Sequence, residues 1–187
     1  MSHTVGKDAT SRGGARRPEI KPRVAVSACL AGDRVRYDGG HRRAAEVDKL
    51  AGEVELVRVC PELELGLGVP RPPIHLVRRG DATALIAESG RDLSAEMARF
   101  SASRIAALRK LGIAGYVLKA RSPSCAVTDA AIRGALDGKG PGLFAAAVMA
   151  AFPGLPVADE ADLAVPGAVA AFVAAVRGYA RRTGQLA

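Results

Sequence analysis

The residues best suited to chemistry in this chain are its three cysteines, Cys29, Cys60 and Cys125. The first two end short apolar runs, and the third lies in the loop that leaves another such run. No two of them form a C-x-x-C pair, which excludes a zinc ribbon or a thioredoxin-type motif. An odd number of cysteines without an export signal argues against a disulfide framework. Three thiolates then indicate a soft metal or an iron–sulfur cluster, unless they are ordinary buried core residues.

The residues beside the cysteines supply groups that could handle protons or orient a ligand. Prolines next to two of the cysteines fix the backbone direction, which suits a preorganised ligand shell. Glu62 follows the second cysteine closely and could activate water. Ser122 and Ser124 place hydroxyls before the third cysteine, and Asp38 lies in a Tyr-Asp-Gly-Gly turn. Each also has a structural interpretation, because Asp38 can form an Asx-turn and the serines can cap a turn.

The elements that must position these residues alternate along the chain. Apolar β-rich runs predict strands, and periodic apolar residues predict helices. This alternation predicts a single α/β domain, a three-layer α/β/α Rossmann-like arrangement with a mostly parallel sheet. Ligand sites in such sheets form beyond the carboxyl ends of the strands, where the cysteines are expected. The predicted strands are 24–29, 55–60, 74–77, 83–87, 115–119 and 155–157; the predicted helices are 43–51, 92–111, 143–152 and 166–182; residues 61–73, with four prolines, are predicted to be a structured loop.

Composition and charge set the domain limits and the expected location. The net charge is +8, and residues 1–23 contribute +4 of it through six basic and two acidic side chains. Residues 1–22 are predicted to be a disordered basic tail, because they lack aromatic residues and periodicity, and 23–187 to be one domain. No run of 18 apolar residues and no signal-peptide pattern is present, so a cytoplasmic protein that does not span a membrane is expected.

The same residues carry a resemblance to a known family. The motifs resemble, in order, those of the thiouracil desulfidases, over about residues 24–160. Ala126 departs from the family's glycine after the third cysteine, and Thr128-Asp129-Ala130 departs from its aromatic-Asp-Gly pattern. The motifs are Ser27-Ala-Cys-Leu30, Arg36-Tyr-Asp-Gly39, Cys60-Pro-Glu62, Pro70-Arg-Pro-Pro73 and Lys119-Ala-Arg-Ser-Pro-Ser-Cys125.

The resemblance implies a cofactor and a reaction. The cofactor would be a [4Fe-4S] cluster held by Cys29, Cys60 and Cys125, with the fourth iron open to the sulfur of a thiocarbonyl. The reaction would be desulfuration without net redox change, in which water replaces the sulfur of 2-thiouracil or 4-thiouridine monophosphate. Glu62 would handle protons and Ser122 would orient the substrate.

Further residues are candidates for substrate contacts. Lys119, Arg71 and Arg121 could bind a phosphate or a pyrimidine oxygen, and Ser124 is a further candidate. Each cation could equally be a solvated surface charge. Asp38 completes the set of candidate catalytic acids.

Two other functions remain open at this stage. A cluster- or metal-binding sensor or scaffold would need the cysteines but not Glu62 or Ser122. An RNA-binding module that uses the basic tail would show salt-sensitive affinity, although the tail has no aromatic residues for base stacking. A small-molecule partner is therefore expected, and nucleic acid is not.

Overall fold

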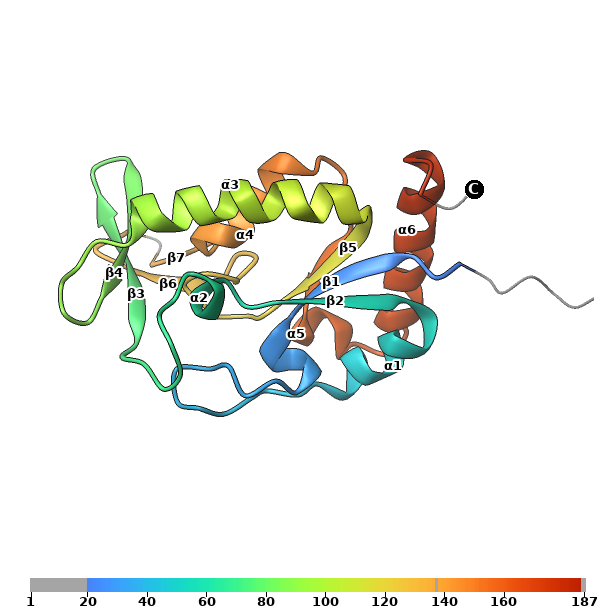
Figure 1. The fold of residues 1–187 in the computed structure, drawn as a ribbon, viewed down its shortest axis with the longest axis horizontal. Coiled ribbons are helices and arrows are strands. Elements are labelled where there is room, and N and C mark those ends of the chain that lie inside the picture. The colour runs from blue at the N-terminus through green and yellow to red at the C-terminus, as the bar shows by residue number, and fades with distance from the viewer. Residues whose placement is uncertain (1–19, 137, 186–187) are drawn as a thin grey trace, which may run out of the picture.

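A four-stranded parallel sheet forms the centre of the molecule (Figure 1). The structure is a computed structural model, and it describes residues 20–136 and 138–185. The strand order is β2-β1-β5-β8, and every neighbouring pair is parallel. The prediction of a mostly parallel α/β sheet is confirmed. The strands are β1 (Arg23–Ser27), β2 (Glu55–Val59), β5 (Ile113–Leu118) and β8 (Val157–Asp159).

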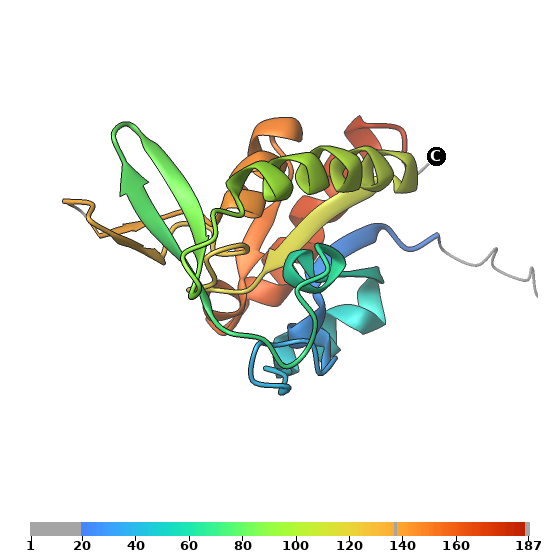
Figure 2. The same cartoon turned by 60° about the vertical axis from the view of Figure 1, so that its left-hand side comes forward.

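Helices lie on both faces of this sheet (Figures 1 and 2), in the predicted three layers. Helix α6 packs against β5, with α1 beside it, and α3 packs against α4. The long helix α3 runs the length of its face of the sheet (Figure 1). No helix in the described part of the chain combines the length and the apolarity needed to cross a membrane. The helices are α1 (Ala45–Glu53), α2 (Pro61–Glu64), α3 (Ser94–Leu111), α4 (Leu143–Ala151), α5 (Glu160–Leu163) and α6 (Ala168–Arg182).

Two neighbouring residues of β5 explain how this strand can be covered on both sides. Gly115 and Tyr116 face opposite sides, because side chains alternate along a strand. A Cβ atom at Gly115 would stand 2.7 Å from the side chain of Val176, so glycine is what lets α6 approach the sheet. The ring of Tyr116 meets that of Phe144 on α4, with their centroids 6.2 Å apart. All six residues of β5 are buried as a result.

A second four-stranded sheet was not predicted as such. Its order is β4-β3-β6-β7, with β3 and β4 forming an antiparallel hairpin and β3 and β6 pairing in parallel. The hairpin itself matches the edge pair expected at 74–77 and 83–87. The strands are β3 (Ile74–Arg79), β4 (Ala82–Ala87), β6 (Ala130–Arg133) and β7 (Lys139–Gly140).

Some local predictions need correction. Cys29 lies in a 3-10 helix, η1 (Ala28–Ala31), rather than in the strand before it. Residues 61–64, expected to be loop, form the short helix α2, because Pro61 suits the first position of a helix. The last helix starts at Ala168, two residues after the predicted start. Residues 1–19 of the predicted tail lie outside the described residues.

Candidate functional site

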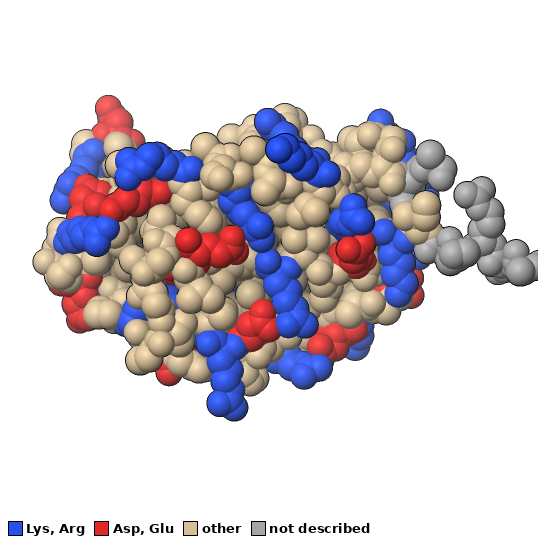
Figure 3. Space-filling view, viewed as in Figure 1, with Lys and Arg blue, Asp and Glu red and all other residues tan. Residues whose placement is uncertain are grey.

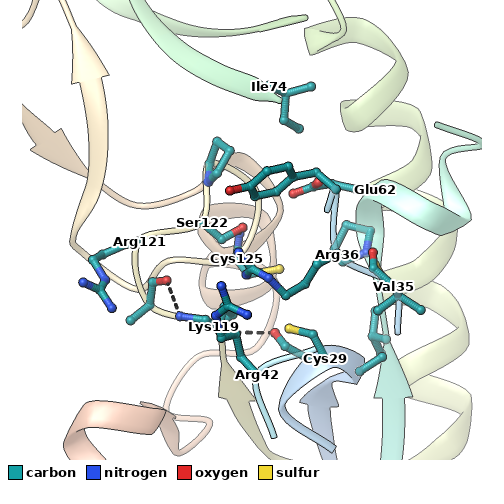
Figure 4. A pocket seen from close by; sticks show the side chains of 18 of the residues that line it. Cys29, Val35, Arg36, Arg42, Glu62, Ile74, Lys119, Arg121, Ser122 and Cys125 are labelled. Atoms are coloured by element: carbon teal, nitrogen blue, oxygen red, sulfur yellow. Dashed lines mark hydrogen bonds between the residues drawn. The ribbon is translucent and has the colours of Figure 1, made fainter. Parts of the chain in front are cut away.

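The carboxyl ends of the main strands meet at one cavity of about 440 Å³ (Figure 4). Strands β2, β1 and β5 are neighbours in the sheet, and each leads into a segment that carries one cysteine. Cys29 follows β1 in η1, Cys60 directly follows β2, and Cys125 lies in the loop after β5. All three line the cavity, together with Glu62 and Ser122. The topology therefore brings together thiols that are far apart in the sequence.

The three thiols are buried or half-buried, and none is in a disulfide. Burial raises the pKa of Cys29 to about 11, and the neighbouring Cys60 sulfur adds to the rise. Burial also raises the pKa values of Cys60 and Cys125, and the Glu62 carboxylate raises that of Cys125 further. Such thiols stay protonated at neutral pH until a metal replaces the proton. The donor set thus suits a soft metal centre assembled inside the cavity.

A single metal ion and an iron–sulfur cluster place different demands on their protein ligands. Among the residues that the structure describes, no three His, Cys, Asp or Glu side chains could hold one metal ion. A single zinc ion holds its sulfur ligands at about 2.3 Å and therefore close to one another. The thiolates of an iron–sulfur cluster bind different iron atoms, so they stand farther apart. Three thiols that form no disulfide and line one cavity are a donor set that suits a soft metal centre.

The start of helix α4 holds the loop that carries Cys125. The backbone N–H of Leu143 donates to Pro123 O at 3.1 Å, and that of Ala145 donates to Ser124 O at 3.0 Å. These donors lie in the first turn of the helix, where N–H groups have no partner within the helix. The N–H of Gly142 donates to Ala126 O at 2.9 Å, so the helix meets the loop on both sides of Cys125.

We expect Gly142→Ala to disturb this contact. A Cβ atom there would lie 2.4 Å from the Ser124 carbonyl carbon and 2.7 Å from the Cys125 nitrogen. Because backbone must move, the free energy of unfolding should fall by about 1–3 kcal/mol, or roughly 2–12 °C in melting temperature, and iron content should fall with it. The control is Gly52→Ala in α1, where nothing lies within 4 Å. Wild-type melting and iron content in Gly142→Ala would contradict the assigned contact.

Glu62 is held on the cavity wall by two partners. Its Oε2 accepts hydrogen bonds from Arg71 Nη2 at 2.7 Å and from Arg71 Nε at 3.1 Å. Its Oε1 accepts one from Ser124 Oγ at 3.0 Å. Ser124 is fully buried and does not line the cavity. Ser124 therefore lies behind Glu62 and away from the cavity. This position does not favour the direct substrate contact that the sequence predicted for Ser124.

Ser122 lines the cavity and organises the loop around it. Its Oγ accepts hydrogen bonds from the backbone N–H groups of Cys125 at 3.1 Å and Ser124 at 3.3 Å. This is the turn-capping role that the sequence left open. The hydroxyl proton is still available, because both of these bonds use the oxygen as acceptor. Ser122 can therefore donate a hydrogen bond to a molecule in the cavity.

Lys119 lines the cavity but already has two partners. Its Nζ donates to Ala120 O at 3.0 Å and to Glu160 Oε1. The other oxygen of Glu160, at the start of α5, accepts from the backbone N–H of Ala120 at 2.8 Å. One proton of the ammonium group remains for a ligand. The sequence predicted no role for Glu160. Only its contacts with Lys119 and Ala120 in the folded chain identify it as a partner of the site.

Asp38 does not line the cavity. Its Oδ1 accepts a hydrogen bond from the Gly40 N–H at 2.9 Å, which lowers the pKa of this carboxyl. This is the Asx-turn interpretation. Asp38 also lies 3.6 Å from Arg36 and 3.7 Å from Arg42, and both of these arginines do line the cavity. The geometry therefore favours a role for Asp38 in holding two cations rather than in catalysis.

Several cavity residues were missed by the sequence predictions. Arg36, Arg42 and Tyr37 line the cavity, and Tyr37 contributes an aromatic ring to it. The Arg36 guanidinium lies 5.3 Å from the centre of that ring, and its Nε makes no hydrogen bond. Arg36 and Tyr37 lie within the Arg-Tyr-Asp-Gly motif, so this motif could have identified them as candidates for the cavity. Figure 4 shows Arg36 and Arg42 on the same side of the cavity as Cys29.

Comparison with known proteins defines the class to which this fold and site belong. The family model of the 2-thiouracil desulfurases matches residues 24–160. This match covers most of the chain, so the chain belongs to the 2-thiouracil desulfurase family. The fold and the family are those of desulfidase enzymes.

Two individual proteins are similar to it. The solved structure of the [4Fe-4S]-dependent thiouracil desulfidase TudS is 32% identical, with a TM-score of 0.63, and the match covers 81% of this chain and 97% of that one. The uncharacterized protein YbbK of Bacillus subtilis (strain 168) is 32% identical over an alignment of 109 residues, and the match covers 54% of this chain and 72% of YbbK.

Proposed function

We propose that this protein is an iron–sulfur-dependent desulfidase that replaces the sulfur of a thiolated pyrimidine with oxygen from water. The observation that carries the proposal is the convergence of Cys29, Cys60 and Cys125 on one cavity that Glu62 also lines. The family match and the similarity to TudS, a [4Fe-4S]-dependent thiouracil desulfidase, point the same way.

The cofactor proposed for the three cysteines is a [4Fe-4S] cluster. When bound, it would supply an iron that no protein thiolate occupies, a Lewis acid for the thiocarbonyl sulfur. Glu62 would take a proton from the attacking water, and Ser122 would donate a hydrogen bond that orients the ring. The water oxygen forms the new C–O bond, the C–S bond breaks, and the sulfur leaves as hydrogen sulfide. The water supplies both protons of the hydrogen sulfide. Carbon and sulfur keep their oxidation states, so the reaction needs no oxidant or reductant.

The charges around the cavity favour an anionic substrate. The basic side chains that line it are Arg36, Arg42, Arg71, Lys119 and Arg121, against Glu62 as the acidic one. Arg71 pairs closely with Glu62, at 2.7 Å, and Lys119 pairs with Glu160, whereas Arg36 and Arg42 have longer contacts with Asp38, at 3.6 and 3.7 Å. Arg36, Arg42 and Arg121 are therefore better placed than Arg71 and Lys119 to meet a phosphate. Of the substrates implied by the resemblance, 4-thiouridine monophosphate therefore fits better than free 2-thiouracil.

A nucleic-acid partner is less compatible with the surface that is visible. On the face shown in Figure 3, the basic side chains of the described residues form only a narrow stripe across the middle, with acidic side chains on either side of it. Binding to a nucleic-acid backbone requires many phosphate contacts on a continuous positive surface. A small thiolated pyrimidine or its nucleotide remains the proposed partner.

The direct test is anaerobic reconstitution of the full chain with iron and sulfide. Iron and acid-labile sulfide are counted per chain, and sulfide release is then measured with 2-thiouracil and 4-thiouridine monophosphate in parallel. We expect close to four irons per chain and release of one sulfide for each oxo-pyrimidine formed. A fully loaded protein that releases sulfide from neither compound would refute the proposed function.

We expect the arginines to discriminate between these two substrates. Arg36→Gln and Arg121→Gln should each raise KM for 4-thiouridine monophosphate by about 10- to 100-fold, as expected for a lost charge-assisted hydrogen bond. KM for 2-thiouracil should change little, because it has no phosphate. Arg34→Gln, an exposed arginine outside the cavity lining, is the control. Equal changes in KM for both substrates would exclude phosphate recognition by these side chains.

A further inference from the structure

We infer that Arg71 is a positioning residue, which fixes the carboxylate of Glu62 at the cavity wall and does not bind the substrate. The inference rests on the proposed function for its kinetic consequence, but the contacts that carry it are independent of any substrate. It replaces the expectation that the positive charge of Arg71 meets a phosphate or a pyrimidine oxygen. Ser124 belongs to the same arrangement and holds the other oxygen of the same carboxylate.

The guanidinium of Arg71 has almost no free hydrogen-bonding capacity. Its Nη1 donates to Val35 O at 3.0 Å and to Gly68 O at 2.8 Å. Its Nε and Nη2 both donate to Glu62 Oε2. Four of the five N–H groups of an arginine are thereby used within the protein. A side chain in this state cannot also provide the two-pronged contact that makes arginine a good phosphate ligand.

Burial supports the same assignment. The Arg71 side chain is 4% exposed and that of Glu62 is 14% exposed, so the carboxylate is the more accessible member of the pair. The backbone N–H of Arg71 donates to Tyr37 O at 3.0 Å. Arg71 thus ties together the segment around residues 35–37, helix α2 and the loop that follows it. A residue bonded to three segments is fixed in place, and it fixes the carboxylate with it.

The orientation of the carboxylate follows from these contacts. Two N–H groups on Oε2 and one O–H group on Oε1 set both the position and the rotation of the Glu62 carboxylate. A lysine at position 71 keeps the positive charge but has a single nitrogen, so it cannot hold Oε2 from two directions. Misplacing a catalytic group by about 1 Å can cost about 10²-fold in rate. Loss of the two-pronged contact should therefore slow the reaction while substrate binding is retained.

Arg71→Lys tests this in the reconstituted full-length protein. We expect kcat to fall by about 10²-fold for both thiopyrimidines, with KM for each within about threefold of wild type, a change too small to represent a lost charged contact. Iron content should match wild type. In the Glu62→Gln background, Arg71→Lys should reduce kcat little further, because the group that it positions has already gone. A rise in KM for the nucleotide alone, with kcat retained, would identify Arg71 as a substrate ligand and overturn the inference.

A second variant and a structural measurement keep the test decisive. Ser124→Ala removes the donor to Oε1 and should lower kcat by about 10-fold with an unchanged KM, as expected for one lost hydrogen bond. The control is Arg79→Lys, whose ion pair with Asp92, at 2.8 Å, also lies outside the cavity lining. It should retain wild-type kcat. Wild-type kcat in both Arg71→Lys and Ser124→Ala would exclude the positioning role.

Urea unfolding of the reconstituted chain separates this inference from the proposed function. Arg71→Lys and Glu62→Ala should each lower the unfolding midpoint, and the double variant should lose less than the sum of the two. Additive losses would mean that the two side chains do not interact, and would refute the positioning of Glu62 by Arg71. If the wild-type protein released no sulfide, the proposed function would fail, and a non-additive result would still establish the contact.

Discussion

Replacing any one of Cys29, Cys60 and Cys125 with serine should abolish both iron binding and sulfide release. Each cysteine lies in the segment that follows a different one of the strands β2, β1 and β5, so no neighbouring thiol can take the place of a lost one. The chain has only these three cysteines. We expect sulfide release to fall by at least about 10³-fold, because Lewis-acid stabilisation by a metal is worth several kcal/mol.

Serine is the informative substitution because it keeps the size and polarity of the side chain. A serine hydroxyl has a much higher pKa than a thiol and is a poor ligand for iron. The control is Ala31→Ser in η1, which adds a hydroxyl close to Cys29 but outside the cavity lining. It should retain iron and activity. The measurements are the iron and sulfide content after anaerobic reconstitution and the rate of sulfide release.

The three variants also test whether the thiols act as a group. If they bind one cluster, the three single variants should lose iron to a similar extent, and no pair of cysteines should retain a stable centre. If one variant, for example Cys29→Ser, kept full iron content, that cysteine would be an ordinary core residue. The cluster would then need a ligand from elsewhere in the chain.

The fold was largely predictable from the sequence, for physical reasons that particular elements illustrate. Residues 24–26 of β1 and the whole of β5 are buried and carry no charged side chain, as expected of strands covered on both faces. Their separation by helical patterns requires parallel pairing, which places the segments after them at one edge of the sheet. The meeting of the cysteine-bearing segments was therefore foreseeable, although the strand order that makes β1 central was not.

The contacts within the site were less predictable, because they depend on long-range packing. Arg71 looked like a substrate ligand from its motif, and only the folded chain shows it paired with Glu62. Glu160 lies 41 residues from Lys119, with which it pairs across adjacent strand ends. Asp38 had two equally acceptable interpretations until its contact with Gly40 favoured one. Charge and residue type indicate what a side chain can do, whereas its partners decide what it is free to do.

The family match ends at residue 160, but helix packing against the main sheet continues beyond it. Helix α6 lies beyond it and covers one face of β5 at Gly115, where a larger residue would displace the helix. The same strand leads directly to the loop that carries Ser122 and Cys125. The C-terminal helix is thus part of the support for the site, although it contributes no side chain to the cavity lining.

Glu62→Gln should separate catalysis from cofactor binding. The amide has nearly the same shape as the carboxylate, and its oxygen can still accept hydrogen bonds from Arg71. It cannot take a proton from water at neutral pH. We expect kcat to fall by about 10²–10⁴-fold, the usual contribution of a general base, while iron content and the visible absorption of the cluster stay at wild-type values.

This result decides between the enzyme and its main rival, a sensor or scaffold that binds the cluster without catalysis. A scaffold needs the three cysteines, but it does not require the Glu62 carboxylate to be held in a fixed orientation at the cavity wall. Glu88→Gln, an exposed glutamate in the turn after β4, is the matched control and should have wild-type activity. Sulfide release that is unchanged in Glu62→Gln would remove Glu62 from the mechanism. Loss of iron in the same variant would instead make Glu62 part of cluster binding, and the proton acceptor would have to be sought among the other residues that line the cavity.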